Sequence, residues 1–207
     1  MSKIIGAVEI GTSVAKVLIG EVSEDKSLNI VGKSLRKNEG MRKGEIVDFR
    51  KTASSVHSAL EEAEKMSGTT VDSIYLAQTG SHLKGSLLKG SANVASPDGR
   101  VSLDDLKSAA AEAKRKQSAP GRSYVHHVRM PIRLDGRPVE DPVGMIGRNV
   151  EVSYWSIEGD ESAIRMNLDL AHQYSLDVED LILSSIASAT LVAGPDLRRA
   201  GVLVIDI

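Results

Sequence analysis

A group of residues near the start of the chain has the types and spacing needed to hold a phosphate. The stretch AVEIGTSVAKVLIGEV places Glu9 before a turn of Gly11, Thr12 and Ser13, and it places Lys16 after that turn. A phosphate is bound by converging backbone N–H groups, nearby hydroxyls and a cation. Gly11 lets the backbone approach closely because it has no Cβ, and the carboxylate of Glu9 can hold the water shell of Mg²⁺. The turn therefore indicates a phosphate site in which Thr12 and Ser13 supply hydroxyls and Lys16 supplies the cation.

The same residues also fit an ordinary β-hairpin. The apolar, β-branched runs at 3–10 and 15–22 predict two strands joined by this turn, and Gly-Thr-Ser is a common turn sequence. The Walker A pattern G-x-x-x-x-G-K-[ST] does not occur in the chain. From the residues alone, the phosphate site and the plain hairpin both remain open.

The composition excludes several classes of function. The chain has 207 residues, a formal net charge of -2 and only 3% aromatic residues, so neither a basic field nor a base-stacking surface indicates a nucleic-acid partner. It has no cysteine, which excludes disulfides and thiolate chemistry and suits a reducing cytosol. The first residues, MSKIIGAVEIG, do not resemble a signal peptide, and no apolar run is long enough to span a membrane. We therefore expect a cytoplasmic protein.

A meander of strands and one long helix should position the turn. Residues 28–35 predict a third strand, and residues 49–67 predict a helix that begins after Asp48 and ends at Gly68. Apolar residues on this helix form one stripe of helical spacing: Ala53, Val56, Leu60, Ala63 and Met66. Residues 71–80 then predict a strand that enters a glycine turn.

The middle of the chain has a different texture, which indicates a separate small α+β unit. Residues 81–96 predict a pair of strands with polar interruptions. Residues 102–116 predict a helix that begins with a capping box of Ser102 and Asp105. Residues 124–138 predict a strand with an Asp-Gly turn, and a further strand of period-2 alternation follows.

The last part of the chain returns to an α/β pattern. Residues 160–176 have helical spacing through Ile164, Leu168 and Ala171, and a strand that passes into a helix follows. The chain ends in GVLVIDI, residues 201–207, which predicts a buried strand. Because the backbone groups of a buried strand need hydrogen-bonding partners, we expect the chain to be a fragment of a longer protein.

Several stretches resemble the bacterial cell-division family FtsA, within the actin and Hsp70-like ATPase superfamily. The acidic-x-Gly-Thr-x-x-x-Lys pattern at 9–16 resembles the first phosphate loop of that superfamily. GMRKGEIVD at 40–48, AEKMSGTTVDSIYLAQTGSHL at 63–83 and PVGMIGRNVEV at 142–152 resemble segments of FtsA itself. GVLVIDI at 201–207 resembles the strand that leads into the second phosphate loop. The motifs occur in the family's order over the whole chain, which therefore resembles an N-terminal fragment of FtsA.

The resemblance implies an α/β fold with an actin-like, ribonuclease H-like subdomain and an inserted small α+β subdomain. Residues 1–80 and 158–200 would form the discontinuous first-lobe subdomain. Residues 81–157 would form the inserted interaction subdomain, of the SHS2-like kind. Residues 201–207 would begin a second lobe that is missing from the chain.

The resemblance also implies a nucleotide-binding adaptor in bacterial cell division. Members of the FtsA family polymerise and link the tubulin-like FtsZ to the membrane. We therefore expect self-association, contact with FtsZ through the missing lobe and contact with the membrane through a C-terminal helix absent here. The insert, 81–157, would contact other divisome proteins. The implied location is the cytoplasm, at the inner face of the cell membrane at the division site.

The same resemblance assigns roles to the site residues. The expected ATP-binding residues are Gly11, Thr12, Ser13 and Lys16. In the full-length protein, Glu9 and Asp206 would hold Mg²⁺ through water. Relatives commonly carry a Glu-Pro pair where this chain has Ser184-Ser185, and a serine hydroxyl is a weaker base than a carboxylate. We therefore expect at most a weak ATPase, with no catalytic residue in this chain. Since one of two phosphate loops is missing, the fragment should bind ATP weakly or not at all.

Two alternatives remain. The related actin-like protein of type IV pilus assembly shares the hairpin and an insert at the same place, but the segments at 40–48 and 142–152 favour FtsA. Another ATPase or a sugar kinase of the superfamily would need a catalytic aspartate near the start of the second lobe and a sugar pocket. Neither feature is visible in this sequence.

Overall fold

The computed structural model describes residues 3–116 and 119–205. The chain divides into two compact units. The first consists of Met1–Leu83 together with Asp160–Ile207, and the second, Lys84–Gly159, is inserted into it. The phosphate-site residues predicted in the first hairpin all belong to the first unit.

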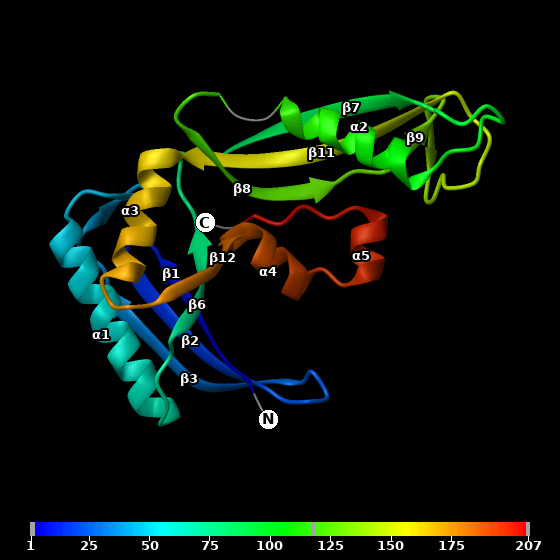
Figure 1. Ribbon diagram of the computed structural model, residues 1–207. Helices are drawn as coiled ribbons and strands as arrows, with labels where there is room; N and C mark the ends of the chain where they lie inside the picture. The colour runs from blue at the N-terminus through cyan, green and yellow to red at the C-terminus, as the bar shows by residue number, and fades with distance from the viewer. Residues whose placement is uncertain (1–2, 117–118, 206–207) are drawn as a thin grey trace. The chain divides into compact units, whose positions relative to one another are not determined.

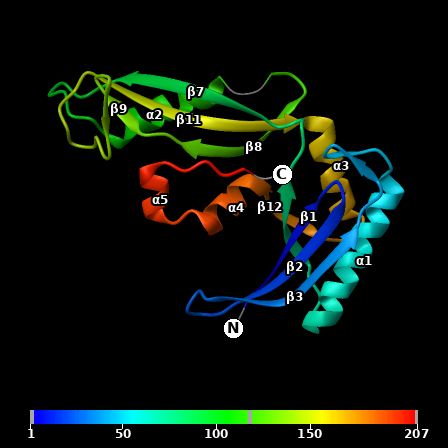
Figure 2. The same cartoon turned by 180° about the vertical axis from the view of Figure 1, so that it is seen from behind.

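A five-stranded sheet forms the centre of the first unit. Its strands are β1 (Lys3–Ile10), β2 (Val14–Val22), β3 (Leu28–Lys37), β6 (Ser73–Gln78) and β12 (Asp177–Leu183). The strand order is β12-β6-β1-β2-β3. β1, β2 and β3 form the predicted antiparallel meander, and they lie side by side in Figures 1 and 2. β6 and β12 run parallel to β1, so the carboxyl ends of these three strands lie at one edge of the sheet.

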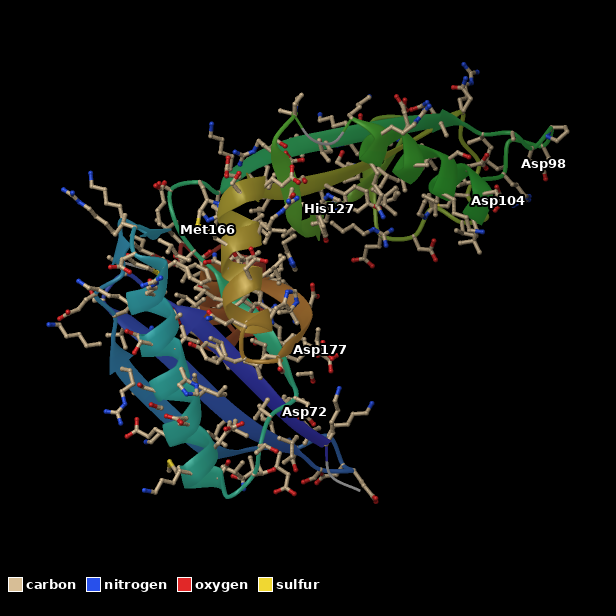
Figure 3. All side chains as sticks on the ribbon, turned by 60° about the vertical axis from the view of Figure 1, so that its left-hand side comes forward. Asp72, Asp98, Asp104, His127, Met166 and Asp177 are labelled. Carbon is tan, nitrogen blue, oxygen red and sulfur yellow. The ribbon has the colours of Figure 1, made fainter. Side chains whose placement is uncertain are left out.

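The amino ends of the parallel strands lie at the opposite edge. The backbone N–H of Asp177, at the start of β12, donates to the carbonyl of Asp72, just before β6, at 2.9 Å. Both residues are labelled in Figure 3. In open α/β sheets of parallel strands, ligands bind at the carboxyl edge, which in this sheet contains the end of β1 and the turn that follows it.

Four helices and a small hairpin complete the first unit as described. They are β4 (Met41–Arg42), β5 (Glu45–Ile46), α1 (Phe49–Ser67), α3 (Glu161–His172), α4 (Ser184–Val192) and α5 (Pro195–Ala200). α1 and α3 bury apolar side chains in one core with the sheet, to which β1, β2 and β6 contribute Val8, Ile19 and Leu76. No helix in the described ranges, 3–116 and 119–205, is long and apolar enough to cross a bilayer.

Helix α1 has the predicted bounds and the predicted caps. The side chain of Asp48 accepts a hydrogen bond from the Lys51 N–H at 3.1 Å, and Gly68 ends the helix in the left-handed region with φ 69°. The predicted apolar stripe is wrong at Met66, which is 59% exposed. Met66 lies at the margin of the buried face, because Thr52 and Ala59 complete that face instead.

Helix α3 has the predicted helical spacing, but one residue of its predicted apolar face is less buried than expected. Ile164 and Ala171 are buried as expected, but Leu170 is fully buried whereas Leu168 is only partly buried. Asp160 caps the helix by accepting hydrogen bonds from the N–H groups of Ser162 and Ala163, both at 3.0 Å. The cap directs the first turn toward the core.

The second unit is one sheet with one helix. Its elements are β7 (Lys84–Asn93), α2 (Leu103–Arg115), β8 (Arg122–Arg129), β9 (Ile132–Leu134), β10 (Arg137–Val139) and β11 (Asn149–Asp160). The sheet order is β10-β9-β11-β7, and β8 also pairs with β11. Helix α2 packs along β7, as Figure 1 shows.

Two expectations for this unit are wrong in detail. The sequence predicts two strands over residues 81–96, but these residues contain the single strand β7. The polar residues that suggest a break between two strands occupy exposed positions of β7. The single strand predicted over 124–138 is divided into β8, β9 and β10. Pro131 separates the first two since it has no N–H to donate to a sheet, and Asp135 and Gly136 form the predicted turn between the others.

The buried strand predicted over 201–207 is also wrong for the described part, 201–205. These residues form no strand, and Leu203 is 83% exposed. A strand exists only where a neighbouring strand accepts its hydrogen bonds, and in the described part of the chain none lies beside this segment.

The capping box of α2 is formed as predicted and perturbs the ionisation of Asp105. Its carboxylate accepts hydrogen bonds from the N–H and the hydroxyl of Ser102, both at 2.8 Å, and from the N–H of Ala95 at 3.1 Å. The Ser102 hydroxyl in turn accepts from the Asp105 N–H at 3.2 Å. These bonds, the one from the Ser102 N–H first, stabilise the charged carboxylate and lower the pKa of Asp105.

Replacing Ser102 with alanine is expected to raise the pKa of Asp105 toward its ordinary value. Because the folded pKa lies below the unfolded one, Asp105 stabilises the fold above the unfolded pKa, and this contribution is lost as pH falls through the folded pKa. NMR titration of the Asp105 carboxyl carbon measures the effect, with Ser108→Ala on the exposed side of α2 as the control. An Asp105 pKa that stays equally low in Ser102→Ala would contradict this assignment.

Candidate functional site

The predicted acidic and basic residues of the first hairpin face each other across it. Glu9 on β1 and Lys16 on β2 are directly paired in the antiparallel register. Lys16 Nζ lies 3.2 Å from each carboxylate oxygen of Glu9. Both side chains are partly exposed, so solvent screens the pair and it contributes little to stability. A stronger anion can therefore recruit the lysine at small cost.

The turn between the two strands has the geometry of an anion-binding loop. The Gly11 N–H donates to the Val14 carbonyl at 3.0 Å. A Cβ at Gly11 would lie 2.8 Å from that same carbonyl oxygen, so the turn needs glycine at this position. Within the described part of the chain, the N–H groups of Thr12 and Ser13 have no hydrogen-bond acceptor, and both residues are exposed. Two free N–H groups at the end of a strand are donors that a phosphate can accept from.

The hydroxyl of Thr12 already has one role in the fold. Thr12 Oγ1 accepts a hydrogen bond from the Gly44 N–H at 2.9 Å. A hydroxyl can accept one bond and donate another, so its proton remains available to a phosphate oxygen. The local pattern of the hairpin predicts neither this contact nor the two bonds from Asn38 to the carbonyls of Gly11 and Ser13. Gly44 belongs to the segment GMRKGEIVD, whereas Asn38 lies two residues before it.

Ser184 lies at the same edge of the sheet. It begins α4 directly after β12, whose last residue, Leu183, pairs with Gln78 at the end of β6. Ser184 is 8% exposed, and its hydroxyl has no hydrogen-bond partner among the described residues. The side chain of Gln78 is buried, and its Oε1 accepts from Asn167 Nδ2 of α3 at 3.0 Å.

The predicted magnesium ligands can be examined only in part. Asp206 lies outside the described residues. Glu9 is a single carboxylate beside the turn, which suits a cation held through its water shell rather than by direct coordination. In the ranges 3–116 and 119–205, no group of three or more His, Cys, Asp and Glu side chains is placed to hold a metal ion directly.

The second unit contains a separate groove of about 620 Å³. Its walls come from α2 and from the strands and loops between β8 and β11. Apolar side chains such as Leu106 and Ile132 line it together with Lys107, Arg129 and Glu140.

Comparison with a known domain family identifies the insert. Residues 80–157 match the family described as the SHS2 domain inserted in FtsA. This segment nearly coincides with the second compact unit of the structure, Lys84–Gly159.

Nearly the whole chain is similar to curated proteins named cell division protein FtsA. It is 29% identical over 204 residues to that of Bacillus subtilis (strain 168), covering 97% of this chain and 46% of the relative. It is 28% identical over 206 residues to that of Pseudomonas aeruginosa, covering 99% and 49%. The resemblance to FtsA predicted from the motifs is confirmed. The chain spans about half the length of the curated relatives it matches.

A solved structure supports the fold. The chain matches a structure of the PilM-PilN type IV pilus biogenesis complex with a TM-score of 0.62 over 91% of this chain and 50% of that one. The sequence identity is 14%, so the likeness concerns the fold alone. Together with the SHS2 match, it confirms the predicted fold class, an actin-like α/β unit with an inserted α+β unit.

Proposed function

We propose, from the similarity of this chain to the first half of FtsA, that it is the nucleotide-binding first part of an FtsA-like actin homologue. The observation that carries the proposal is the tip of the β1–β2 hairpin. Free N–H groups of Thr12 and Ser13, their hydroxyls and the ammonium group of Lys16 gather at the end of β1. These are the donors that the polyphosphate of ATP requires.

Each residue at the tip of the β1–β2 hairpin would have its own role in binding ATP. Lys16 would exchange the carboxylate of Glu9 for a phosphate oxygen, which would accept a charge-assisted hydrogen bond. The carboxylate of Glu9 would then be able to accept hydrogen bonds from the water shell of Mg²⁺. The Mg²⁺ ion, when bound, neutralises charge on the polyphosphate. Gly11 lets the phosphate reach the backbone because it carries no side chain.

The site is better suited to holding nucleotide than to hydrolysing it. Ser184 provides a neutral hydroxyl where a general base would be needed to activate water. Nucleotide would act as a structural ligand that closes two lobes, with at most slow hydrolysis. We expect the 207-residue chain alone to bind MgATP weakly, since the second phosphate loop would come from the part of the relatives that it does not span.

The whole protein would act as an adaptor in cell division. Its FtsA-like relatives support a role in which it self-associates, contacts FtsZ through the second lobe and reaches the inner face of the cell membrane through a C-terminal helix. The SHS2-like insert would contact other division proteins, and we place that contact at its groove of about 620 Å³.

Depleting the protein in its host is expected to block septation and to produce filamentous cells. Supplying the intact gene should restore division, and a gene with the insert deleted should not. Normal division after depletion would contradict the proposal.

A second candidate function is assembly of type IV pili. The chain shares only its fold with the PilM-PilN complex, while the SHS2 match and the FtsA relatives favour division. The same depletion separates the two, because loss of surface pili with unchanged septation would indicate the pilus role.

A further inference from the structure

We propose that Asn38 is a positioning residue that holds the phosphate loop, Gly11 to Ser13, in its binding conformation. The proposal rests on the proposed function, since it assigns the loop to phosphate. Asn38 directly follows β3 and is only 4% exposed. No motif or comparison points to it.

Asn38 is bonded to both ends of the loop. Its side-chain Nδ2 donates to the Gly11 carbonyl at 2.9 Å, and its backbone N–H donates to the Ser13 carbonyl at 2.8 Å. Its Oδ1 accepts from the Gly40 N–H at 3.1 Å, which fixes the orientation of the amide. With its carbonyls bonded on the inner side, the loop directs the N–H groups of Thr12 and Ser13 outward, where a phosphate can accept from both.

The rest of the segment 38–44 supports the middle of the loop. The Gly44 N–H donates to Thr12 Oγ1 at 2.9 Å. Gly44 has φ 80°, and a Cβ there would lie 2.5 Å from the Cα of Gly80, so the two backbones are in contact. A Cβ at Gly40 would lie 2.2 Å from Thr52 Oγ1 of α1. The segment is therefore wedged between the loop on one side and α1 and the Gly80 turn on the other.

This arrangement gives the motif GMRKGEIVD a physical role. Backbone N–H groups bind a phosphate well only when the loop is already in the bound conformation, because ordering a mobile loop consumes binding free energy. The glycines of the motif allow close packing, and Asn38, two residues before it, joins that packed segment to the loop. Since the amide of Asn38 is uncharged and contacts only backbone, its role is positioning.

Asn38→Leu tests the proposal because leucine has the same shape and lacks the hydrogen bonds. In the 207-residue chain without nucleotide, we expect the amide protons of Gly11 and Gly44 to exchange about tenfold faster. Both report loop order, since these N–H groups donate to the Val14 carbonyl and to Thr12 Oγ1 and not to the side chain of residue 38. In an NMR titration with MgATP, we expect the affinity measured at Thr12 and Ser13 to fall by about fivefold. Asn167→Leu is the matched control: Asn167 is also buried, but its side chain bonds Gln78 rather than the loop.

The outcomes separate this proposal from the proposed function. Unchanged exchange at Gly11 and Gly44 in Asn38→Leu would overturn the positioning role, whatever the nucleotide does. Faster exchange with unchanged affinity would also overturn it. Faster exchange in a chain whose Thr12 and Ser13 amides never respond to MgATP would support the positioning role of Asn38 and contradict the phosphate assignment. A similar loss in Asn167→Leu would show that global stability, not Asn38, controls the loop.

A second substitution covers the case in which Asn38→Leu does not fold. Asn38→Asp keeps the acceptor for the Gly40 N–H and removes only the donor to the Gly11 carbonyl. Its added charge would itself repel phosphate, so only the exchange of Gly11 and Gly44 is compared. Exchange as slow as in the parent chain would overturn the proposal.

Discussion

Replacing Gly90 with alanine is expected to lower the free energy of unfolding of the inserted unit by about 1–3 kcal/mol, the usual cost of overpacking a core. Gly90 lies in β7, where α2 crosses the strand so closely that a Cβ would lie 2.1 Å from the Ala109 carbonyl oxygen and 2.3 Å from the Ala113 nitrogen. These are backbone atoms of a helix, so no rotamer change can relieve the contact. Urea unfolding of the 207-residue chain measures the loss, and faster amide exchange in α2 locates it.

Gly85→Ala is the matched control on the same strand. The three atoms nearest to a Cβ at Gly85 all belong to the indole of Trp155, which is 44% exposed and can rotate away. Both substitutions reduce the entropy of the unfolded chain equally, so their difference reports the packing against α2. Equal stability of the two variants would contradict the close approach of α2 and β7.

Replacing Lys16 with glutamine is expected to weaken MgATP binding by about tenfold or more. A hydrogen bond to a charged group contributes about 1.5–3 kcal/mol, and 1.4 kcal/mol corresponds to a factor of ten in affinity. NMR titration of the 207-residue chain with MgATP measures the change at the loop amides.

Lys33→Gln is the control for the loss of one positive charge. Lys33 is exposed on β3 and pairs with Leu18 of β2. Leu18 lies two residues after Lys16, so Lys33 and Lys16 are on the same face of the sheet. A nonspecific electrostatic effect would lower affinity equally in both variants, and that result would count against a specific contact between Lys16 and phosphate.

Much of the fold could be predicted because local signals and tertiary packing agree. Asp48 and Gly68 set the ends of α1, and the apolar runs before and after Gly11 set β1 and β2. The errors occur where burial depends on neighbours that a single sequence does not show. Leu168 packs against the core but is only partly buried, whereas Leu170 is fully buried, and Met66 falls at the margin of the buried face of α1.

The residue types of the candidate site could be predicted from the sequence, but the contacts that hold its loop in place could not. Glu9, Gly11 and Lys16 follow from the local pattern of one hairpin. Asn38 lies 27 positions after Gly11 in the sequence, and Gly44 lies 32 positions after Thr12. Local periodicity does not predict contacts between residues so far apart in the sequence. Gly44 could be recognised as a glycine of a motif, but its contact with Thr12 depends on how the β4–β5 hairpin packs.

The central claim is that the turn of Gly11, Thr12 and Ser13 is a phosphate loop. An NMR titration of the 207-residue chain with MgATP, repeated with magnesium tripolyphosphate, tests it most directly. We predict that both ligands shift the Thr12 and Ser13 amides most strongly, with dissociation constants in about the millimolar range that agree within about twofold, because the contacts are to phosphate. Amides at the turn that do not respond, or a response to MgATP alone, would contradict the claim.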